Sequence, residues 1–435
     1  MKTKRLFILA LIGFLLGRAY ILKFPPPFYS DVNHDYQRYA NMWSYGYPPY
    51  LKHFYEYPPA TIPLLYFPLF VDHLGIGQYY QNYRYMTFFL DLLIFVFILK
   101  TILKLKTKPL SKVLSLGFYL IGPVIAKDFF YEGIDLAFIG SLSIALISLL
   151  LLHQKKFFQR LLFWAFFWLS TSIKFMSAPL LVPYFYLKKL AAKQEIKAAI
   201  LGFFLIWGLP LVIFRTSLAV MFVFHARRGL KYASFPSFIV ETINYWTQTE
   251  TRLNQPPDFQ LQGPVSVIAE KIVAIVFPLS ILLVLIYSLW VIFKPNLKKL
   301  HSSFKQLLLI QTIKLNHLDP YTFSLKLALI YIFTIFLTGK VFSQPFHIWL
   351  IPLIALFPFR SLKRQLTFII LTIWLLIIDT TPWIAVDESI MVVEPLPMKF
   401  FLYLSRFLPM IFLLALSFKL PNKIRLSNKI SQSHA

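Results

Sequence analysis

The stretch VSVIAEKIVAIVFPLSILLVLIYSLWVIF, at 265–293, indicates the class of this protein. It is long enough to cross a bilayer as a helix, which takes about 20 predominantly apolar residues. The stretch 84–103 has the same character, and further apolar blocks follow, separated by polar segments. A soluble core accounts for one such block but not for many. The sequence therefore predicts an all-α, polytopic membrane protein.

The charges support this prediction. Hydrophobic residues make up 58% of the 435 positions and charged residues only 14%, where soluble domains have about 25%. A net charge of +26 could indicate nucleic-acid binding, but the basic residues cluster at the ends of apolar blocks, as at 100–112 and 188–197. Such clusters mark cytoplasmic loops, so nucleic acid is not expected as a partner. Because the chain has no cysteine, disulfides and thiolate metal sites are excluded.

One arrangement of the spans places every basic cluster in the cytoplasm. It has about twelve crossings, at 6–22, 84–103, 112–127, 134–152, 161–173, 176–187, 198–214, 265–293, 322–338, 346–359, 365–379 and 399–418. Both termini are then cytoplasmic, and the chain 1–435 forms one domain with outer loops at 23–58, 215–264 and 380–398. The stretch 59–74 is short and rich in proline, so we expect it to re-enter or to lie in the outer interface.

The sequence also indicates which membrane the protein occupies. The first span resembles a signal peptide, but Gly17-Arg18-Ala19-Tyr20 is a poor cleavage site, so we expect it to be retained. The sequence carries no signal for the endoplasmic reticulum. We therefore expect a multi-pass protein of the bacterial plasma membrane; a dolichol-based enzyme of the endoplasmic reticulum, which would have the same orientation, is the alternative.

The first outer loop is unusually aromatic. It reads SDVNHDYQRYANMWSYGYPPYLKHFYEYPPATIPLLYFP over 30–68 and combines carboxylates with rings and proline-fixed turns. Tyr and Trp rings at this position could anchor the loop in the membrane interface or stack on sugar rings. The loop by itself leaves both roles open.

The order of motifs in this loop resembles a known family. Asp-Val, Tyr-x-x-Tyr-Ala, Gly-Tyr-Pro-Pro-Tyr and Glu-Tyr-Pro-Pro follow one another as in the first outer loop of GT-C glycosyltransferases. The loop is most similar to glycosyltransferase family 87, which comprises polyprenol-phosphate-mannose-dependent mannosyltransferases and their relatives. The segments FVFHARRGLKYASFPSF (222–238) and GKVFSQPFHIWLIPL (339–353), and Lys174 before a proline-containing helix, resemble later segments of that family.

The chain also departs from the family pattern. Gln344-Pro345 inverts the usual Pro-Gln order, and Phe346 stands where tyrosine is common. Ala233 stands where many relatives carry glutamate. These departures bear on the acceptor and the sugar more than on the class of reaction.

The resemblance implies a reaction and a base. A polyprenyl-phosphate sugar donor would give up its sugar, mannose in this family, to a glycan or lipid-linked acceptor at the outer face, with inversion at the anomeric carbon. Because phosphate is a good leaving group, the reaction needs a base for the acceptor hydroxyl and cations for the phosphate. Asp31 matches the family's catalytic aspartate, with Asp35 and Glu56 as the alternatives. Asp31 could also serve as a helix N-cap.

Cations and rings near the outer boundary are the candidates for substrate binding. They are Tyr36, Tyr50, Tyr57, Lys174, His225, Arg227, Arg228, Lys340 and Ser343. Arginine can form a bidentate contact with phosphate, in which two N–H groups bind two oxygens. Arg227 could equally reach lipid headgroups. Lys340 sits in a short turn between two spans, where a charge is best tolerated facing a wet cavity. No metal is expected, because the first loop has no Asp-x-Asp pair, and no cofactor is expected.

Two other functions remain open from sequence. A transferase that moves arabinose or another pentose differs only in the shape of its pocket. A transporter or flippase tends to show internal repeats and broken helices at mid-membrane. Here the candidate groups lie in the outer loops instead, as they would also in a scaffold that uses the first loop for adhesion.

Overall fold

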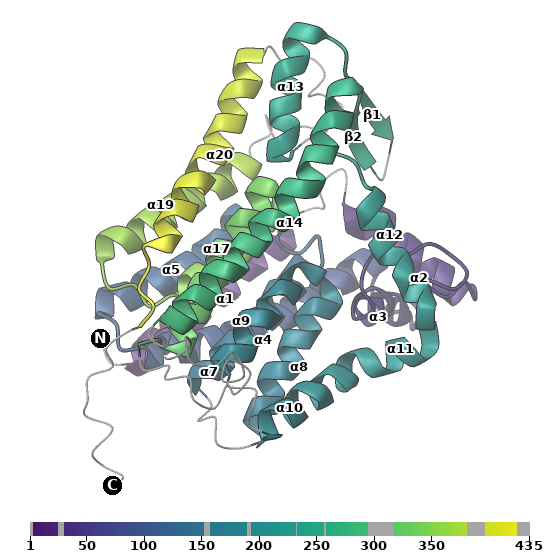
Figure 1. The fold of residues 1–435 in the computed structure, drawn as a ribbon. Helices are drawn as coiled ribbons and strands as arrows, with labels where there is room; N and C mark the ends of the chain where they lie inside the picture. Colours follow the sequence, from purple (N-terminus) through teal and green to yellow (C-terminus); the bar gives the residue numbers. More distant parts are fainter. Residues whose placement is uncertain are drawn as a thin grey trace.

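The computed structural model describes residues 3–24, 30–151, 157–188, 193–231, 233–255, 258–294, 317–380 and 396–423. Long helices form one bundle, and shorter elements gather at the end of the bundle remote from the start of α1 (Thr3–Lys23) (Figure 1). We call this end the loop end. It consists of segments 30–60, 215–262 and 339–345. The opposite end carries the start of α1 and the last residues of α20 (Leu396–Phe418).

Six helical runs in the described part of the chain are long and apolar enough to cross a membrane. They are Arg5–Lys23, Tyr79–Lys104 (α4), Lys193–Arg227, Pro264–Phe293 (α14), Pro320–Thr338 (α17) and Phe400–Phe418. Shorter apolar helices lie among them, including α5 (Pro109–Ile125) and α7 (Asp135–Leu151). The chain is a helical, multi-pass integral membrane protein.

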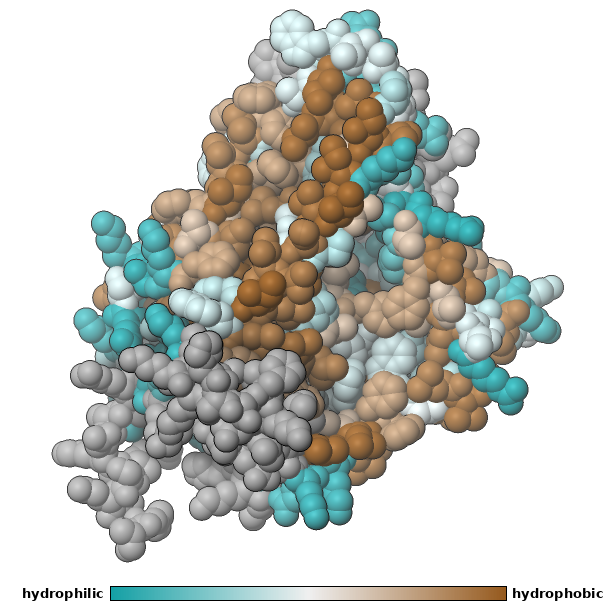
Figure 2. Space-filling model, in the orientation of Figure 1, coloured by the Kyte–Doolittle hydropathy of each residue, from teal (hydrophilic) through white to brown (hydrophobic). Residues whose placement is uncertain are grey.

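The surface of the bundle fits a lipid environment. Helix α14 forms a continuous apolar ridge across the face seen in Figure 2. On that helix Ile275 is 66% exposed and Leu283 is 63% exposed. An apolar surface of this extent would be a liability in water, whereas hydrocarbon covers it at no cost.

The centre of the bundle is α17. Every residue from Tyr321 to Leu337 is buried, and the helix packs against α20, α14 and α7. Asp319 caps its first turn by accepting a hydrogen bond from Thr322 N. A helix that is apolar all round is expected in the interior of a bundle.

Each predicted span coincides with a helical segment. The pair 161–173 and 176–187 corresponds to α8 (Phe157–Ile173) and to η2 (Phe175–Leu180) with α9 (Leu181–Leu187). The span at 346–359 corresponds to η7 (Gln344–Trp349) and α18 (Leu350–Leu356), and the next to α19 (Leu362–Thr380). The span 198–214 is part of a longer arm.

That arm is built from five consecutive elements that follow one another without a gap: α10 (Lys193–Phe203), η3 (Phe204–Gly208), α11 (Leu209–Phe214), η4 (Arg215–Leu218) and α12 (Ala219–Arg227). Of these, η3 is a π-helical turn. Arg215 has a positive φ of 47° where α11 ends. These irregular turns bend the arm, so that it leaves α8 and rises toward the loop end (Figure 1).

The loops contain more structure than the sequence indicated. The stretch 59–74 is α3 (Thr61–His73), whose 13 residues span only about 20 Å at 1.5 Å per residue. The loop 215–264 holds α12, α13 (Phe235–Thr247) and an antiparallel hairpin of β1 (Thr251–Gln255) and β2 (Asp258–Gln262). Apart from this short hairpin, the described part of the fold is helical, as predicted. Most of the loop 380–398 lies outside the described residues.

Inside the bundle, charged residues occur in closed groups. Arg18 Nε donates to Asp91 Oδ2 at 2.7 Å, and the hydroxyls of Tyr119 and Tyr131 donate to the same carboxylate at 2.9 and 3.0 Å. Arg18 and Asp91 are both fully buried. Gly17 of α1 lies against Val124 of α5, and the absence of a side chain lets the two helices approach.

Candidate functional site

Four segments that are distant in sequence meet at the loop end. The backbone N–H of Lys231 donates to Lys340 O at 2.9 Å, and Lys340 Nζ donates to Ala226 O at 2.9 Å. The N–H of Ala60 donates to Ser172 O at 2.9 Å. The first two bonds join the end of α12 and the segment after it to the turn after α17, and the third joins the first loop to the end of α8.

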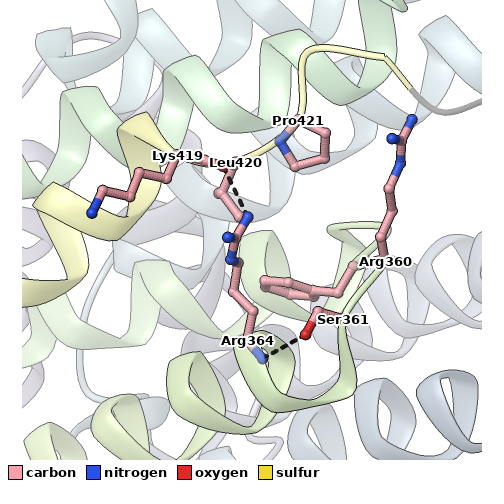
Figure 3. Close-up of a pocket in the computed structure, with 7 residues that line it drawn as sticks. Arg360, Ser361, Arg364, Lys419, Leu420 and Pro421 are labelled. Atoms are coloured by element: carbon pink, nitrogen blue, oxygen red, sulfur yellow. Dashed lines mark hydrogen bonds between the residues drawn. The ribbon is translucent and has the colours of Figure 1, made fainter.

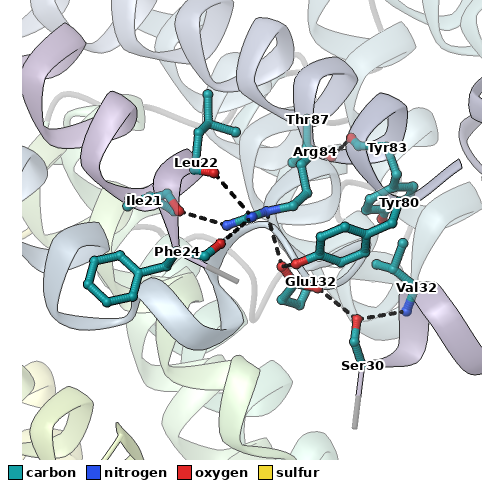
Figure 4. A network of polar contacts seen from close by, with 10 residues as sticks. All are labelled: Ile21, Leu22, Phe24, Ser30, Val32, Tyr80, Tyr83, Arg84, Thr87 and Glu132. Atoms are coloured by element: carbon teal, nitrogen blue, oxygen red, sulfur yellow. Dashed lines mark hydrogen bonds and ion pairs between the residues drawn. The ribbon is translucent and has the colours of Figure 1, made fainter. Parts of the chain in front are cut away.

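A buried network holds the start of the first loop (Figure 4). Arg84 of α4 donates to the carbonyls of Ile21 at 2.7 Å and Phe24 at 2.8 Å, so it closes the C-terminal end of α1. Its Nε lies 3.2 Å from Glu132 Oε1. The other oxygen of Glu132 accepts from Ser30 Oγ at 2.7 Å. The network therefore fixes the residue directly before Asp31.

Asp31 does not act as the helix cap that its position allowed. Its side chain makes no capping hydrogen bond to η1 (Val32–Tyr36). Ser30 Oγ instead accepts from Val32 N at 3.2 Å. The carboxylate of Asp31 is therefore not used to start the helix.

The surroundings of Asp31 alter its protonation. The pKa of Asp31 is raised from 3.8 to about 6, chiefly by burial, and the nearby carboxylates of Asp35 and Asp135 contribute to this rise. Lys231 and Lys174 act in the opposite direction and lower it. A carboxylate with a pKa near 6 is largely ionised at neutral pH and accepts a proton more readily than an ordinary aspartate.

Beside Asp31, a second carboxylate holds Lys174 in place. Lys174 Nζ donates to Asp135 Oδ1 at 2.6 Å, and Trp349 Nε1 donates to the same oxygen at 2.6 Å. The ammonium lies 4.5 Å from the ring centroid of Phe346 and 5.0 Å from that of Trp349. Two rings on η7 thus make cation–π contacts with Lys174.

The approach of Asp135 to the first loop depends on Gly133. A Cβ at this position would lie 3.2 Å from Asp135 Oδ2 and 3.8 Å from the hydroxyl of Tyr36. A Cβ here would press on the Asp135 carboxylate, whereas its distance to the Tyr36 hydroxyl would be an ordinary contact. The glycine therefore leaves room for the carboxylate of Asp135.

The third predicted carboxylate, Glu56, lies at the other edge of the group. It is buried, and burial raises its pKa, while Arg228 lowers it. His225 lies against the backbone of Glu56. Phe54 and Phe224 pack with ring centroids 5.0 Å apart, so α12 is docked onto the first loop.

Asp35 differs from Asp31 in its partner. Its Oδ1 accepts from Arg38 Nη2 at 3.0 Å on the exposed side of the loop. Burial raises the pKa of Asp35, and Arg38 lowers it. Asp35 is thus engaged locally, one helical turn from Asp31.

The predicted tyrosines form the packed support of the loop. Tyr36 is buried with its ring centroid 5.7 Å from that of Tyr57 and 5.7 Å from that of Tyr83. Burial raises the pKa of Tyr36 well above 10, and Asp31 raises it further, so its hydroxyl stays protonated. Tyr50 is buried and donates its hydroxyl to the carbonyl of Tyr57.

The remaining candidates are spread along the edge of the site. Lys340 is half-buried, and burial lowers its pKa. Ser343 precedes η7, and its carbonyl accepts from Phe346 N at 2.9 Å. Arg227 is exposed at the end of α12. In the described part of the chain no contact joins Arg227 to the other candidates.

Three site residues were missed from sequence. Lys231 and Asp135 both act on the charge of Asp31, and Trp349 holds Asp135. Lys231 directly follows the Arg-Gly-Leu motif and Trp349 lies within the 339–353 motif, so both residues stand in segments that the sequence had singled out. The sequence did not show that these residues converge, because Asp135 and Trp349 are 214 residues apart.

The arrangement is a carboxylate of raised pKa facing several cations. Within the described ranges, no group of three or more His, Cys, Asp or Glu side chains is placed to hold a metal ion. Comparisons of the chain with protein-family models, with curated proteins and with solved structures found no match.

Proposed function

We propose that this protein is a membrane glycosyltransferase that moves a sugar, taken to be mannose, from a polyprenyl-phosphate donor to an acceptor hydroxyl. The observation that carries the proposal is the partly accessible carboxylate of Asp31, which lies near enough to Lys231 and Lys174 for both cations to lower its pKa. The motif order of the first loop, which resembles GT-C glycosyltransferases of family 87, supports the same reaction.

The reaction balances with these groups alone. The acceptor oxygen attacks the anomeric carbon from the face opposite the phosphate, and its proton passes to Asp31. The bond between that carbon and the phosphate oxygen breaks, and the phosphate leaves with the electron pair. Lys174, Lys231 and Arg228 are the cations that would stabilise the negative charge on the leaving phosphate.

A lipid-linked donor also suits the shape of the molecule. Figure 2 shows the surface hollowed between α14 and the arm formed by α11 and α12. Phe175 of η2 lies between the walls: its ring centroid is 4.5 Å from that of Phe222 on α12, and η2 packs against α14. Lys174 directly precedes Phe175. A phosphate beside Lys174 could therefore extend its lipid chain over Phe175 into the membrane.

The orientation in the membrane follows from the proposal. The loop end would face the extracytoplasmic side, with about twelve crossings and both termini in the cytoplasm. The basic clusters between α4 and α5 and after α20 lie at the opposite end of the bundle, as the positive-inside rule requires. The short length of α3 supports an interfacial or re-entrant position.

The test is transfer of labelled mannose by purified protein in membrane vesicles. We expect labelled product from polyprenyl-phosphate-mannose and none from a nucleotide-activated mannose, because the hollow between α14 and the arm has room for a lipid chain beside Lys174. Parallel reactions with polyprenyl-phosphate-arabinose would identify a pentose transferase. Movement of intact donor across the vesicle membrane without product would show a flippase and contradict the proposal.

A further inference from the structure

A second charged site lies at the opposite end of the bundle from Asp31. There a hollow is lined by the turn before α19 and the segment after α20: Phe359, Arg360, Ser361, Arg364, Lys419, Leu420 and Pro421 (Figure 3). Three of these side chains are cationic, and no carboxylate is among them. We propose that this hollow binds the phosphate headgroup of an anionic phospholipid.

The wall of the hollow is fixed by the chain itself. Arg364 Nη1 donates to Lys419 O at 2.8 Å, and Arg360 donates to the carbonyl of Lys423. From the inner side, the buried Lys326 Nζ donates to Leu420 O at 2.9 Å and to Asn422 Oδ1 at 2.9 Å. The segment after α20 is therefore preorganised rather than loosely attached.

These bonds also make the hollow electropositive. Carbonyl oxygens at the end of a helix carry partial negative charge. Here arginine and lysine N–H groups donate to these oxygens and so offset that negative charge. Each arginine has five N–H groups and uses one in the bond described, so most of the guanidinium remains to contact an anion. Arginine pairs with two phosphate oxygens at once.

The position favours a lipid over a soluble phosphate. The candidate span Phe400–Phe418 ends one residue before Lys419, so the hollow lies where a bilayer places its headgroups. Phe359, Leu420 and Pro421 add an apolar side to the lining, which suits the glycerol backbone of a lipid. Free phosphate has no apolar part to match.

The test compares lipid retention by native mass spectrometry of the full-length protein. The double variant Arg360→Gln/Arg364→Gln removes two charges but keeps an N–H donor for each carbonyl. The control Lys104→Gln/Lys108→Gln removes two exposed charges, one at the end of α4 and one directly before α5. We expect wild type and the control to retain phosphatidylglycerol in preference to phosphatidylcholine, and the hollow variant to bind it about 10-fold more weakly.

A single variant guards against misfolding. Lys419→Gln removes one exposed cation and leaves the backbone carbonyl of residue 419 available to Arg364. We expect about a 5-fold weaker retention of phosphatidylglycerol with an unchanged unfolding temperature. Equal retention by wild type and Lys419→Gln would overturn the proposal. Displacement of the lipid by inorganic phosphate at equal concentration would overturn its assignment to a lipid.

Discussion

Two groups of ionisable residues in this protein, one in the bundle interior and one at the loop end, are built differently. In the bundle interior, Asp91 is saturated: Arg18 and the hydroxyls of Tyr119 and Tyr131 all donate to it. At the loop end, Asp31 makes no capping bond and faces charges of both signs. A saturated buried charge cannot lose a partner without a large cost in stability, whereas an unsaturated one in reach of solvent is free to exchange a proton.

The largest expected effect separates the two groups through activity. Asp31→Asn keeps the size of the side chain and removes its proton affinity. If Asp31 is the base, the transfer rate should fall about 100-fold to 10,000-fold while donor binding stays near normal. The rate and donor affinity of purified protein check this. An active Asp31→Asn variant would move the base to Asp35, or to Glu56 if Asp35→Asn is active as well.

The next effect concerns stability. Asp91→Asn leaves Arg18 buried without its counter-charge, and breaking a buried pair costs about 3–5 kcal/mol. Thermal unfolding in detergent should therefore occur well below the wild-type temperature. Asp72→Asn, at the end of α3, is the control and should change little. Unaltered unfolding of Asp91→Asn would mean that the interior pair does not hold the bundle.

A smaller effect is expected in the pH profile. Lys231 lowers the pKa of Asp31, so Lys231→Gln should raise that pKa above about 6. Since the base acts when ionised, activity is lost as pH falls through this pKa, and the acid limb should move to higher pH. The profile of kcat/KM between pH 5 and 8 measures the shift. The control Lys52→Gln, which lies in the same loop as Asp31, should leave the acid limb of the profile unmoved.

The smallest effect is expected at Asp35. Its carboxylate pairs with Arg38 on the exposed side of the loop, and such pairs contribute at most about 1 kcal/mol. Asp35→Asn should therefore retain at least about a third of the wild-type transfer rate. A loss comparable to that of Asp31→Asn would show that Asp35, and not Asp31, corresponds to the catalytic aspartate of the first-loop motif.

The contrast between the two groups also explains what the sequence could show. Apolar blocks such as 265–293 predicted the helices, because hydrocarbon thickness imposes their length. The single charges inside such blocks, Arg18 and Asp91, gave no indication that they meet. Their pairing depends on which helix faces neighbour one another, and a single sequence does not record this.

The same reasoning applies at the loop end. Asp31, Glu56, Lys174 and Arg228 were predicted from local motifs, and the fold gathers them at the loop end. Lys231 and Asp135 were missed because their role comes from their positions relative to Asp31, not from a motif of their own. The hairpin in 251–262 was missed as well, since its strands lie in a loop that was read only for its charges.

The most direct test of Asp31 as the general base is the unfolding temperature of the Asp31→Asn variant, measured together with its activity. The folded protein holds the Asp31 proton at a pKa of about 6, against 3.8 for the unfolded chain. Ionisation of Asp31 therefore costs stability as pH rises from about 4 through 6. At pH 7.5 the variant should be inactive and at least as stable as wild type. A variant that is active, or that unfolds at a lower temperature, would contradict the account.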